Sequence, residues 1–234
     1  MCEAAIGNAR ELSPQPTLET HGFQLLSSPC NVDFEDQAQL APYLEATADL
    51  VSEATGAKLC KAFNHVRIDT QLDHFGKRGG AVERVHGDYT ADSGPRMLDE
   101  LRERGVLPSS SAGRPGAILN VWRNASATPV RSKPLAVCDC NSVPRGELGV
   151  YHLVEGGDAS PRRQGQNLKL HYSPAHAWWY FPEMMKDEAL VFWTYDGRVP
   201  EAPRFTFHAA FEPADTPPDA PPRRAMIVRC AALF

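Results

Sequence analysis

The second half of the chain consists largely of short apolar runs, and these limit the possible fold more than any other feature. From residue 117 onward, seven runs rich in apolar, aromatic or β-branched residues are separated by proline, glycine and asparagine. They cover residues 117–123, 133–139, 148–154, 167–173, 188–196, 204–211 and 224–234. Seven such runs after a helical N-terminal portion are typical of a sandwich or barrel rather than of repeated β-α-β units. The sequence therefore predicts a mainly β fold with flanking helices.

Two helical patterns precede these runs. Residues 42–56 carry apolar side chains at helical spacing and end at Gly56, a residue that suits a helix C-cap. A second helix is predicted to start near Pro95 and to stop at Gly105.

The organisation of the chain is predicted to be simple. The first twenty residues are polar and contain Pro14 and Pro16, so we expect residues 1–20 to form a loose N-terminal arm. No break in composition marks a second domain, and residues 21–234 are expected to form a single domain.

Charge and hydropathy argue against several kinds of partner. The net charge is −5 and the pI is about 5.9, with basic residues scattered rather than gathered in a stripe, so nucleic acid is not expected to bind. No stretch approaches the roughly 20 apolar residues that span a bilayer, and the N-terminus lacks the pattern of a secretion signal. We therefore expect a cytoplasmic protein without a membrane partner. The sequence carries no signal for its oligomeric state.

A His-x-Asp pair, His86 and Asp88, is the first candidate for a functional site. Residues two apart on an extended strand point the same way, so both side chains can face one metal ion. Two histidines and one carboxylate on one face of iron(II) leave three positions for an oxidisable co-substrate and dioxygen. The third ligand would come from far along the chain. The alternative is that the pair is only a polar strand end that runs into a turn.

His208 is the candidate for the distal ligand. It lies in a strand-like run with aromatic neighbours, and Arg223 and Arg224 follow it after 15 and 16 residues. A guanidinium binds carboxylates in bidentate fashion, so an arginine about one strand beyond the distal histidine suits the remote carboxylate of a co-substrate. Six other histidines compete for this role: His21, His65, His74, His152, His171 and His176.

Further residues are weaker candidates. Arg123 either reaches a carboxylate in the pocket or forms an internal salt bridge. Tyr89 follows the metal pair closely enough to form hydrogen bonds beside it. His176, Trp178 and Tyr180 belong to an aromatic cluster that either lines the substrate pocket or builds the core.

Longer motifs, in a fixed order, narrow these alternatives. They are VHGDYTADSGPR (85–96), NVWR (120–123), PLAVCD (134–139), HAWWYFPEM (176–184), DEALVFWTYD (187–196), FHAAFEP (207–213) and DAPPRRAMIVR (219–229). From about residue 20 to the C-terminus, this order resembles the AsaB-like hydroxylase/desaturase family, also called the CmcJ/NvfI family. Its members are non-haem iron(II)- and 2-oxoglutarate-dependent oxygenases of secondary metabolism.

The resemblance implies a double-stranded β-helix (a jelly roll, cupin-like) with helices packed outside, and iron(II), 2-oxoglutarate and dioxygen as cofactor and co-substrates. On the family pattern, His86 and Asp88 are the proximal iron ligands and His208 is the distal one. Arg223, in the position of the family's PPR motif, binds the 2-oxoglutarate carboxylate, with Arg224 as the second choice. The implied activity is C–H abstraction from a small natural product or amino-acid derivative, ending in hydroxylation, desaturation or ring closure.

Two other classes of protein fit the same ligands. A jelly-roll protein could bind metal without redox turnover, and a zinc hydrolase could use two histidines and one aspartate around an activated water. The late arginine favours the oxygenase, because neither alternative needs a carboxylate clamp. The chain departs from the family pattern at Trp193-Thr194 and at Ala209, so the substrate itself is not implied.

Overall fold

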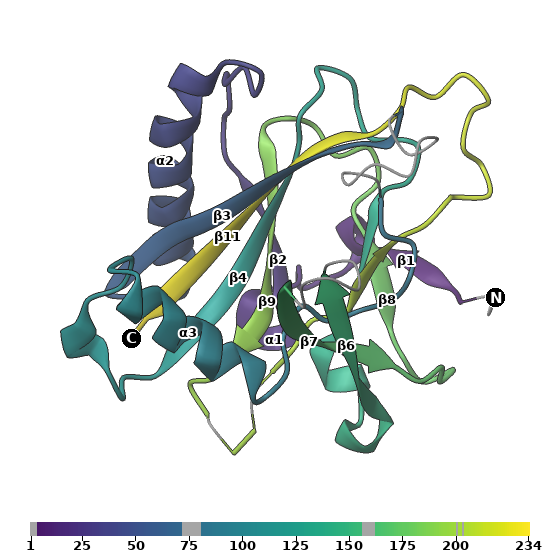
Figure 1. The fold of residues 1–234 in the computed structure, drawn as a ribbon. Coiled ribbons are helices and arrows are strands. Elements are labelled where there is room, and N and C mark those ends of the chain that lie inside the picture. Colours follow the sequence, from purple (N-terminus) through teal and green to yellow (C-terminus); the bar gives the residue numbers. More distant parts are fainter. Residues whose placement is uncertain (1–3, 72–80, 156–161, 200, 203) are drawn as a thin grey trace.

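The computed structural model describes residues 4–71, 81–155, 162–199, 201–202 and 204–234. Strands in these residues form two large sheets and one two-stranded sheet (Figure 1). The five-stranded sheet has the order β2 (Phe23–Ser27), β9 (Glu188–Asp196), β4 (Gly116–Asn124), β11 (Arg224–Leu233) and β3 (Leu59–Asp69). The four-stranded sheet has the order β1 (Ile6–Asn8), β8 (Trp178–Tyr180), β5 (Leu135–Cys138) and β10 (His208–Ala210). β6 (Leu148–Glu155) pairs antiparallel with β7 (Arg162–Leu170).

The described residues contain the helices α1 (Leu18–His21), α2 (Gln37–Thr55) and α3 (Ser93–Glu103), together with short 3-10 turns. α2 begins earlier than predicted because the Asp36 side chain accepts the Ala38 N–H at 2.9 Å and so caps the helix. It ends at Gly56, as predicted, in the left-handed conformation. Among the described residues, no helix has both the length and the apolar character needed to cross a membrane.

The core has two layers, one on each face of the five-stranded sheet. Alternate residues of β4 face opposite sides, and every residue of this strand is buried. Leu119 and Val121 pack into the cluster under α2, which runs along the outer face of the sheet (Figure 1). Trp122 packs with Leu135 and Val137 of the other sheet. A strand covered on both faces reads as a continuous apolar run, which explains why β4 is visible in the sequence.

The predicted mainly β fold with flanking helices is confirmed. The seven predicted runs overlap strands β4, β5, β6, β7, β9, β10 and β11. The apolar pattern missed β3, an edge strand on which His65 and Arg67 are exposed and interrupt the apolar residues. It also missed β2 and the short strands β1 and β8.

The N-terminal segment is not the loose arm that its prolines and polar residues suggested. β1 pairs in parallel with β8, and the guanidinium of Arg10 binds both carboxylate oxygens of Glu188 at 2.7 and 2.8 Å. The carbonyl of the buried Leu18 accepts the Trp193 Nε1–H at 3.0 Å. α1 ends at Gly22, whose φ of +87° favours glycine. Backbone pairing and a few anchored side chains hold this segment, so its polar composition was misleading.

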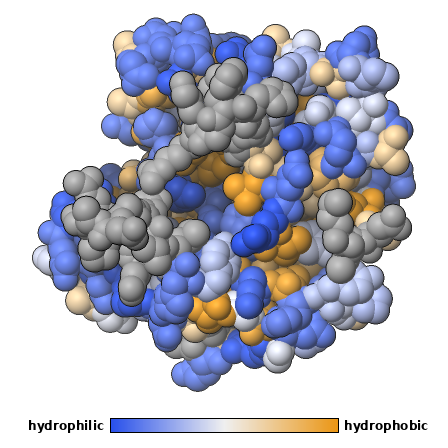
Figure 2. Space-filling view, turned by 45° about the vertical axis from the view of Figure 1, so that its right-hand side comes forward, coloured by the Kyte–Doolittle hydropathy of each residue, from blue (hydrophilic) through white to orange (hydrophobic). Residues whose placement is uncertain are grey.

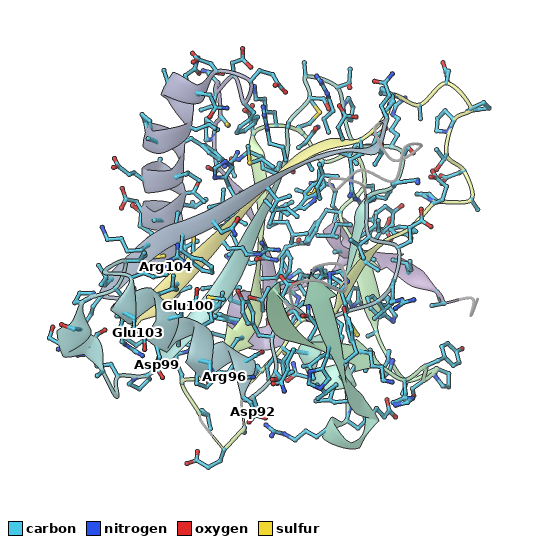
Figure 3. All side chains as sticks on the ribbon, viewed as in Figure 1. Asp92, Arg96, Asp99, Glu100, Glu103 and Arg104 are labelled. Atoms are coloured by element: carbon cyan, nitrogen blue, oxygen red, sulfur yellow. The ribbon has the colours of Figure 1, made fainter. Side chains whose placement is uncertain are left out.

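α3 and β7 fix the chain segment that carries His86 and Asp88. Gly87 exchanges two backbone hydrogen bonds with Leu168 of β7, both of 2.9 Å. The hydroxyl of Ser93, the first residue of α3, donates to the Gln166 carbonyl at 2.9 Å. Gly94 lies against the ring of Tyr195, where a Cβ atom would come within 2.5 Å of ring carbons. After this first turn, α3 carries the charged side chains of Arg96, Asp99, Glu100 and Glu103 (Figure 3).

Candidate metal centre

Backbone pairing holds His86 and His208 side by side. The His86 N–H donates to the His208 carbonyl at 3.2 Å, and the His208 N–H donates to the His86 carbonyl at 3.0 Å. The Asp88 side chain lies on the same side, with Oδ1 3.6 Å from His86 Nε2 and 3.8 Å from His208 Nε2. The structure therefore brings the three predicted ligands together, with their ligand atoms all within 4.8 Å of one another.

The other described histidines lie apart from this site. Within the part of the chain that the structure describes, no second group of three histidine, cysteine or carboxylate ligand atoms is as close together. His21, His65, His152, His171 and His176 belong to no such group, and His74 falls outside the described residues.

Backbone carbonyls determine which ring nitrogen of each histidine carries the proton. His86 Nδ1 lies 2.8 Å from the Arg84 carbonyl, and His208 Nδ1 lies 3.2 Å from the Thr206 carbonyl. A carbonyl oxygen can only accept, so each Nδ1 carries the proton. In the neutral form of each ring, which is the form that binds a metal, the lone pair then lies on Nε2 and faces the space beside Asp88.

The neighbours of Asp88 fix the direction and charge of its carboxylate. Oδ2 accepts a hydrogen bond from Asn120 Nδ2 at 2.8 Å and lies 3.9 Å from Arg229 Nε. Burial alone would raise the pKa of Asp88, but the charges of His208, Arg229 and His86 and the Asn120 amide outweigh it and lower this pKa to about 2. Burial, aided by the neighbouring His86, lowers the pKa of His208 to about 4. Asp88 is therefore ionised and His208 neutral at pH 7, as metal binding requires.

Arg223 and Arg224 point in different directions. Arg223 is buried, with its guanidinium carbon 5.7 Å from the centre of the Trp122 ring and Nη1 bonded to the Lys133 carbonyl. The buried Nε1–H of Trp122 has no hydrogen-bond partner among the described residues. The side chain of Arg224 is 56% exposed and donates to Asp69 Oδ2 at 3.1 Å. Of the two candidates, Arg223 is the one turned to the interior.

Arg123 is not brought to the metal ligands. On β4 it lies three residues from Asn120, so it faces the opposite side of the sheet, toward α2. Its guanidinium donates to the carbonyls of Ser28 and Lys186 at 2.7 and 2.8 Å, to the Ser28 hydroxyl at 2.8 Å and to the Tyr43 hydroxyl at 3.3 Å. These bonds tie β4 to α2 and to two loops.

Three aromatic candidates lie outside the pocket beside Asp88. His176 Nε2 is bonded to Glu147 Oε2 at 2.5 Å, and the histidine ring is buried. Trp178 belongs to a core cluster of the smaller sheet. The ring of Tyr180 stacks edge-on against Phe211 with a centroid distance of 5.0 Å. None of the three side chains lines that pocket.

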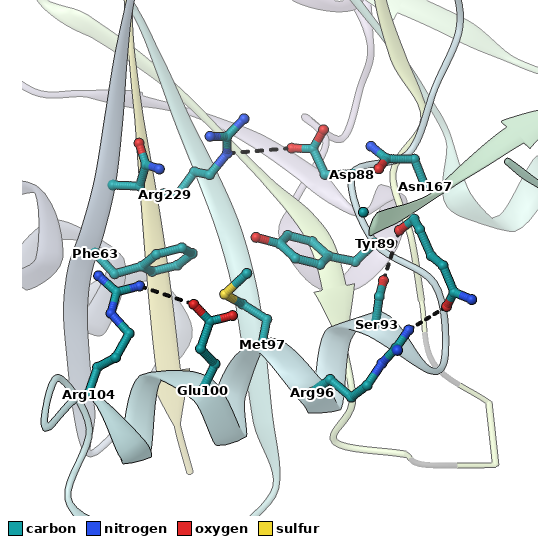
Figure 4. A pocket seen from close by; sticks show the side chains of 13 residues that line it. Phe63, Asp88, Tyr89, Ser93, Arg96, Met97, Glu100, Arg104, Asn167 and Arg229 are labelled. Carbon is teal, nitrogen blue, oxygen red and sulfur yellow. Dashed lines mark hydrogen bonds and ion pairs between the residues drawn. The ribbon is translucent and has the colours of Figure 1, made fainter. Parts of the chain in front are cut away.

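A cavity of about 680 Å³ lies beside Asp88 (Figure 4). Tyr89 lines it together with Phe63 of β3 and Met97 of α3. The space-filling view of one face of the molecule shows a hollow in which hydrophobic residues lie among hydrophilic ones (Figure 2). The volume is that of a site for a small organic molecule.

The sequence reasoning missed two polar residues of this site, Asn120 and Arg229. Asn120 of β4 and Arg229 of β11 are register partners. Together with Phe192 of β9, the partner of Asn120, and Asn64 of β3, the partner of Arg229, they form one cross-strand row of four residues. Asn120 and Arg229 are each a polar residue with apolar neighbours on both sides in its strand, and such an interruption is an informative sign of a functional interior. Which face of the strand they occupy follows only from the register.

The chain matches the family described as oxidoreductase/YMDC permease-like domain over residues 2–233. It is 28% identical over 253 residues to the hydroxylase/desaturase efuI of Hormonema carpetanum, covering 98% of this chain and 82% of that protein. It is 29% identical over 223 residues to the Fe(II)/2-oxoglutarate-dependent dioxygenase nvfI of Aspergillus novofumigatus, covering 91% and 76%. A solved structure of the iron and alpha-ketoglutarate-dependent endoperoxidase NvfI has a TM-score of 0.86 at 25% identity, covering 98% of this chain and 82% of that one.

These similarities bear out two expectations. The overlap in fold with NvfI, together with the paired antiparallel sheets, confirms the predicted jelly roll. Relatives named hydroxylase/desaturase confirm the predicted family resemblance. Because the family match spans nearly the whole sequence, the chain belongs to this family of oxidoreductases.

Proposed function

We propose that this protein is an iron(II)- and 2-oxoglutarate-dependent oxygenase that oxidises a small organic substrate. The observation that carries the proposal is the triad, in which two imidazole nitrogens and one ionised carboxylate oxygen meet beside a pocket of small-molecule size. A relative named as an Fe(II)/2-oxoglutarate-dependent dioxygenase supports the same cofactors. With dioxygen, bound iron(II) and 2-oxoglutarate supply the oxidising power that breaks a substrate C–H bond, leaving succinate and carbon dioxide.

His86 and His208 would hold the metal through Nε2, and Asp88 through Oδ1. Asn120 keeps Oδ2 of Asp88 engaged, so the carboxylate offers one oxygen and the remaining coordination positions stay open. Phe192 packs its ring 4.8 Å from that of His208 and closes the site on its inner side. The chain thus contributes orientation and exclusion of water.

Arg223 is our choice for the remote carboxylate of 2-oxoglutarate. Trp122 lies two residues, about 7 Å, along β4 from Asn120, the residue that binds Asp88, and Arg223 lies over the Trp122 ring. A five-carbon diacid therefore has the right length to reach from the metal ligands to Arg223. The buried indole N–H beside Arg223 supplies a second donor suited to a carboxylate. A zinc hydrolase or a redox-inactive metal protein has no need of this arrangement.

We propose a small natural product or an amino-acid derivative as the substrate. Hydroxylation, desaturation and ring closure can share one site of this kind, because the position of the substrate decides the fate of the carbon that loses hydrogen. The pocket beside Asp88 is where that position would be set.

The test needs no substrate. 2-Oxoglutarate is added to the anaerobic iron(II) protein, and the weak visible charge-transfer band of a chelated keto acid is recorded. We expect the band in the wild type and in the control His65→Ala, which removes an exposed histidine, and its loss in His86→Ala. Iron binding without a band would overturn the oxygenase in favour of a metal-binding protein or a hydrolase.

A further inference from the structure

The pocket beside Asp88 is apolar in its middle and charged at both ends. Phe63, Tyr89 and Met97 lie between the end that holds Arg229 and Asp88 and the end formed by α3 (Figure 4). A ligand that fills this pocket would therefore place an apolar body against the three middle side chains and polar groups at its ends.

The arginines that line the pocket differ in their contacts. Arg96 donates to the Gln166 side-chain oxygen at 2.5 Å and to the Asp92 carbonyl at 3.2 Å, and Arg104 lies 3.5 Å from Glu100. Within the described part of the chain, the Arg229 guanidinium donates no hydrogen bond, and its ion-pair contact is the one with Asp88 at 3.9 Å. This side chain is 28% exposed, and the donors of its guanidinium can reach the cavity.

Metal binding would weaken the hold of Asp88 on Arg229. Asp88 Oδ2 already accepts the shorter bond from Asn120, and a bound divalent cation would neutralise the charge of Asp88. The charges of iron(II), Asp88, doubly charged 2-oxoglutarate and Arg223 sum to zero. Arg229 then adds one positive charge, and a bound substrate would have to supply the negative charge that pairs with it. Asn64, opposite Arg229 in the register of β3 and β11, lines the same cavity and adds an amide donor.

We propose that Arg229 binds a carboxylate of the substrate, so that the substrate is an organic acid whose apolar body lies against Phe63, Tyr89 and Met97. This inference rests on the proposed function and deepens it. The acid group is held next to the metal ligands, and the carbon that is oxidised therefore lies within a few bonds of it. The apolar body extends toward α3.

The co-substrate is accommodated elsewhere. Arg223 directly precedes β11 and lies six residues from Arg229, a backbone separation of about 20 Å along an extended chain, and its buried guanidinium lies over Trp122. The two arginines can thus serve two different carboxylates, one for the co-substrate and one for the substrate.

The experiment uses the zinc(II) protein saturated with 2-oxoglutarate, so that the metal and co-substrate sites are filled and no turnover occurs. Calorimetric titration compares 4-phenylbutyrate with 4-phenylbutanamide, which has a similar shape and no charge. We expect the wild type to bind the acid at least about tenfold more tightly than the amide, as a charge-assisted pair provides. Arg229→Gln should remove this preference, Arg229→Lys should keep part of it, and Arg67→Gln, an exposed charge of β3, should keep all of it.

Each other outcome counts against the proposal. Equal binding of the two probes, or binding of neither, in the wild type would exclude an organic acid of this kind. An unchanged preference in Arg229→Gln would remove Arg229 from that role. Loss of the 2-oxoglutarate band in the iron(II) form of Arg229→Gln, with the acid preference intact, would assign Arg229 to the co-substrate instead. If the wild type binds metal but not 2-oxoglutarate, the proposed function fails, whereas the same titration on the metal-loaded protein still decides the role of Arg229.

Discussion

Asp88 turns Oδ1 toward the same space as the two Nε2 atoms because Asn120 binds its other oxygen. Asn120 reaches Oδ2 from β4, a strand far from Asp88 in the sequence, and the amide itself is buried. Hydrogen bonds to a ligand of this kind orient it and are commonly as important as the ligand for metal affinity. At the residue scale, the site therefore depends on a partner that carries no metal-binding signature of its own.

The first prediction concerns this amide. Asn120→Ala should lower the affinity for iron(II) by about tenfold or more, because the carboxylate of Asp88 loses the bond that directs it. Anaerobic metal titration of the folded protein measures the change. Asn64→Ala, in the same cross-strand row but without a bond to Asp88, should retain the wild-type metal affinity, and an equal loss in both variants would argue against a specific role of Asn120.

The second prediction separates Arg223 from Arg224, the first residue of β11. Arg223→Ala should weaken 2-oxoglutarate binding at least about tenfold and leave iron binding nearly unchanged, because it removes a charged donor remote from the metal. Arg224→Ala, which removes an exposed side chain, should change neither. Titration of the visible band with 2-oxoglutarate gives the affinity for the co-substrate, and anaerobic metal titration gives the affinity for iron(II). The reverse pattern would assign the carboxylate contact to Arg224.

At the scale of elements, the placement of α3 depends on one glycine. Gly94 lets the first turn of the helix approach the Tyr195 ring, and the Ser93 hydroxyl ties the same turn to β7. The segment with His86 and Asp88 runs directly into this turn. The helix therefore supports the segment that carries the proposed metal ligands and forms one wall of the pocket.

The third prediction tests that support. Gly94→Val should lower the free energy of unfolding by about 1–3 kcal/mol, because the new side chain meets the Tyr195 ring and forces the helix outward. Denaturant unfolding measures the loss. Gly146→Ala is the control, because an added Cβ there meets no atom within 4 Å, and its stability should stay near that of the wild type.

Sequence and structure agree most closely for the elements covered on both faces. β4 and β9 were predicted because burial on two sides makes them continuously apolar, whereas β3, on the sheet edge, mixes polar and apolar residues and was missed. His86 and Asp88 were found from their local spacing. Asn120 and Arg229 were not, because their meeting with Asp88 depends on strand register, which no local pattern reveals.

At the scale of the whole molecule, one cluster of charges joins the N-terminal segment to the rest. Asp196, at the end of β9, is bonded to Arg198 and Arg204, and both arginines also reach Glu19 of α1. Burial would raise the pKa of Asp196, but the hydrogen bonds from Arg198 and Arg204 outweigh it and lower this pKa below its ordinary value. The cluster holds α1 against the end of the five-stranded sheet.

The fourth prediction concerns this cluster. Asp196→Asn should lower the free energy of unfolding by about 3 kcal/mol at pH 7, because two arginines lose a buried partner. Since the pKa is depressed in the folded state, the contribution of Asp196 is complete above its unfolded pKa of about 4 and is lost as the pH falls through the folded value. Denaturant unfolding at pH 7 and in acid should show the wild type and the variant converging in acid. Asp99→Asn, at an exposed carboxylate, should change stability little at either pH.

The reciprocal backbone bonds between His86 and His208 have a consequence for amide hydrogen exchange. Because each amide is protected by the carbonyl of the other ligand, the two protons can exchange with solvent only when the same short ladder opens, and they should do so at a common rate. That opening would also separate the two imidazoles, so we expect the release of a metal ion bound between them and the exchange of these two amides to report on a single motion of the chain.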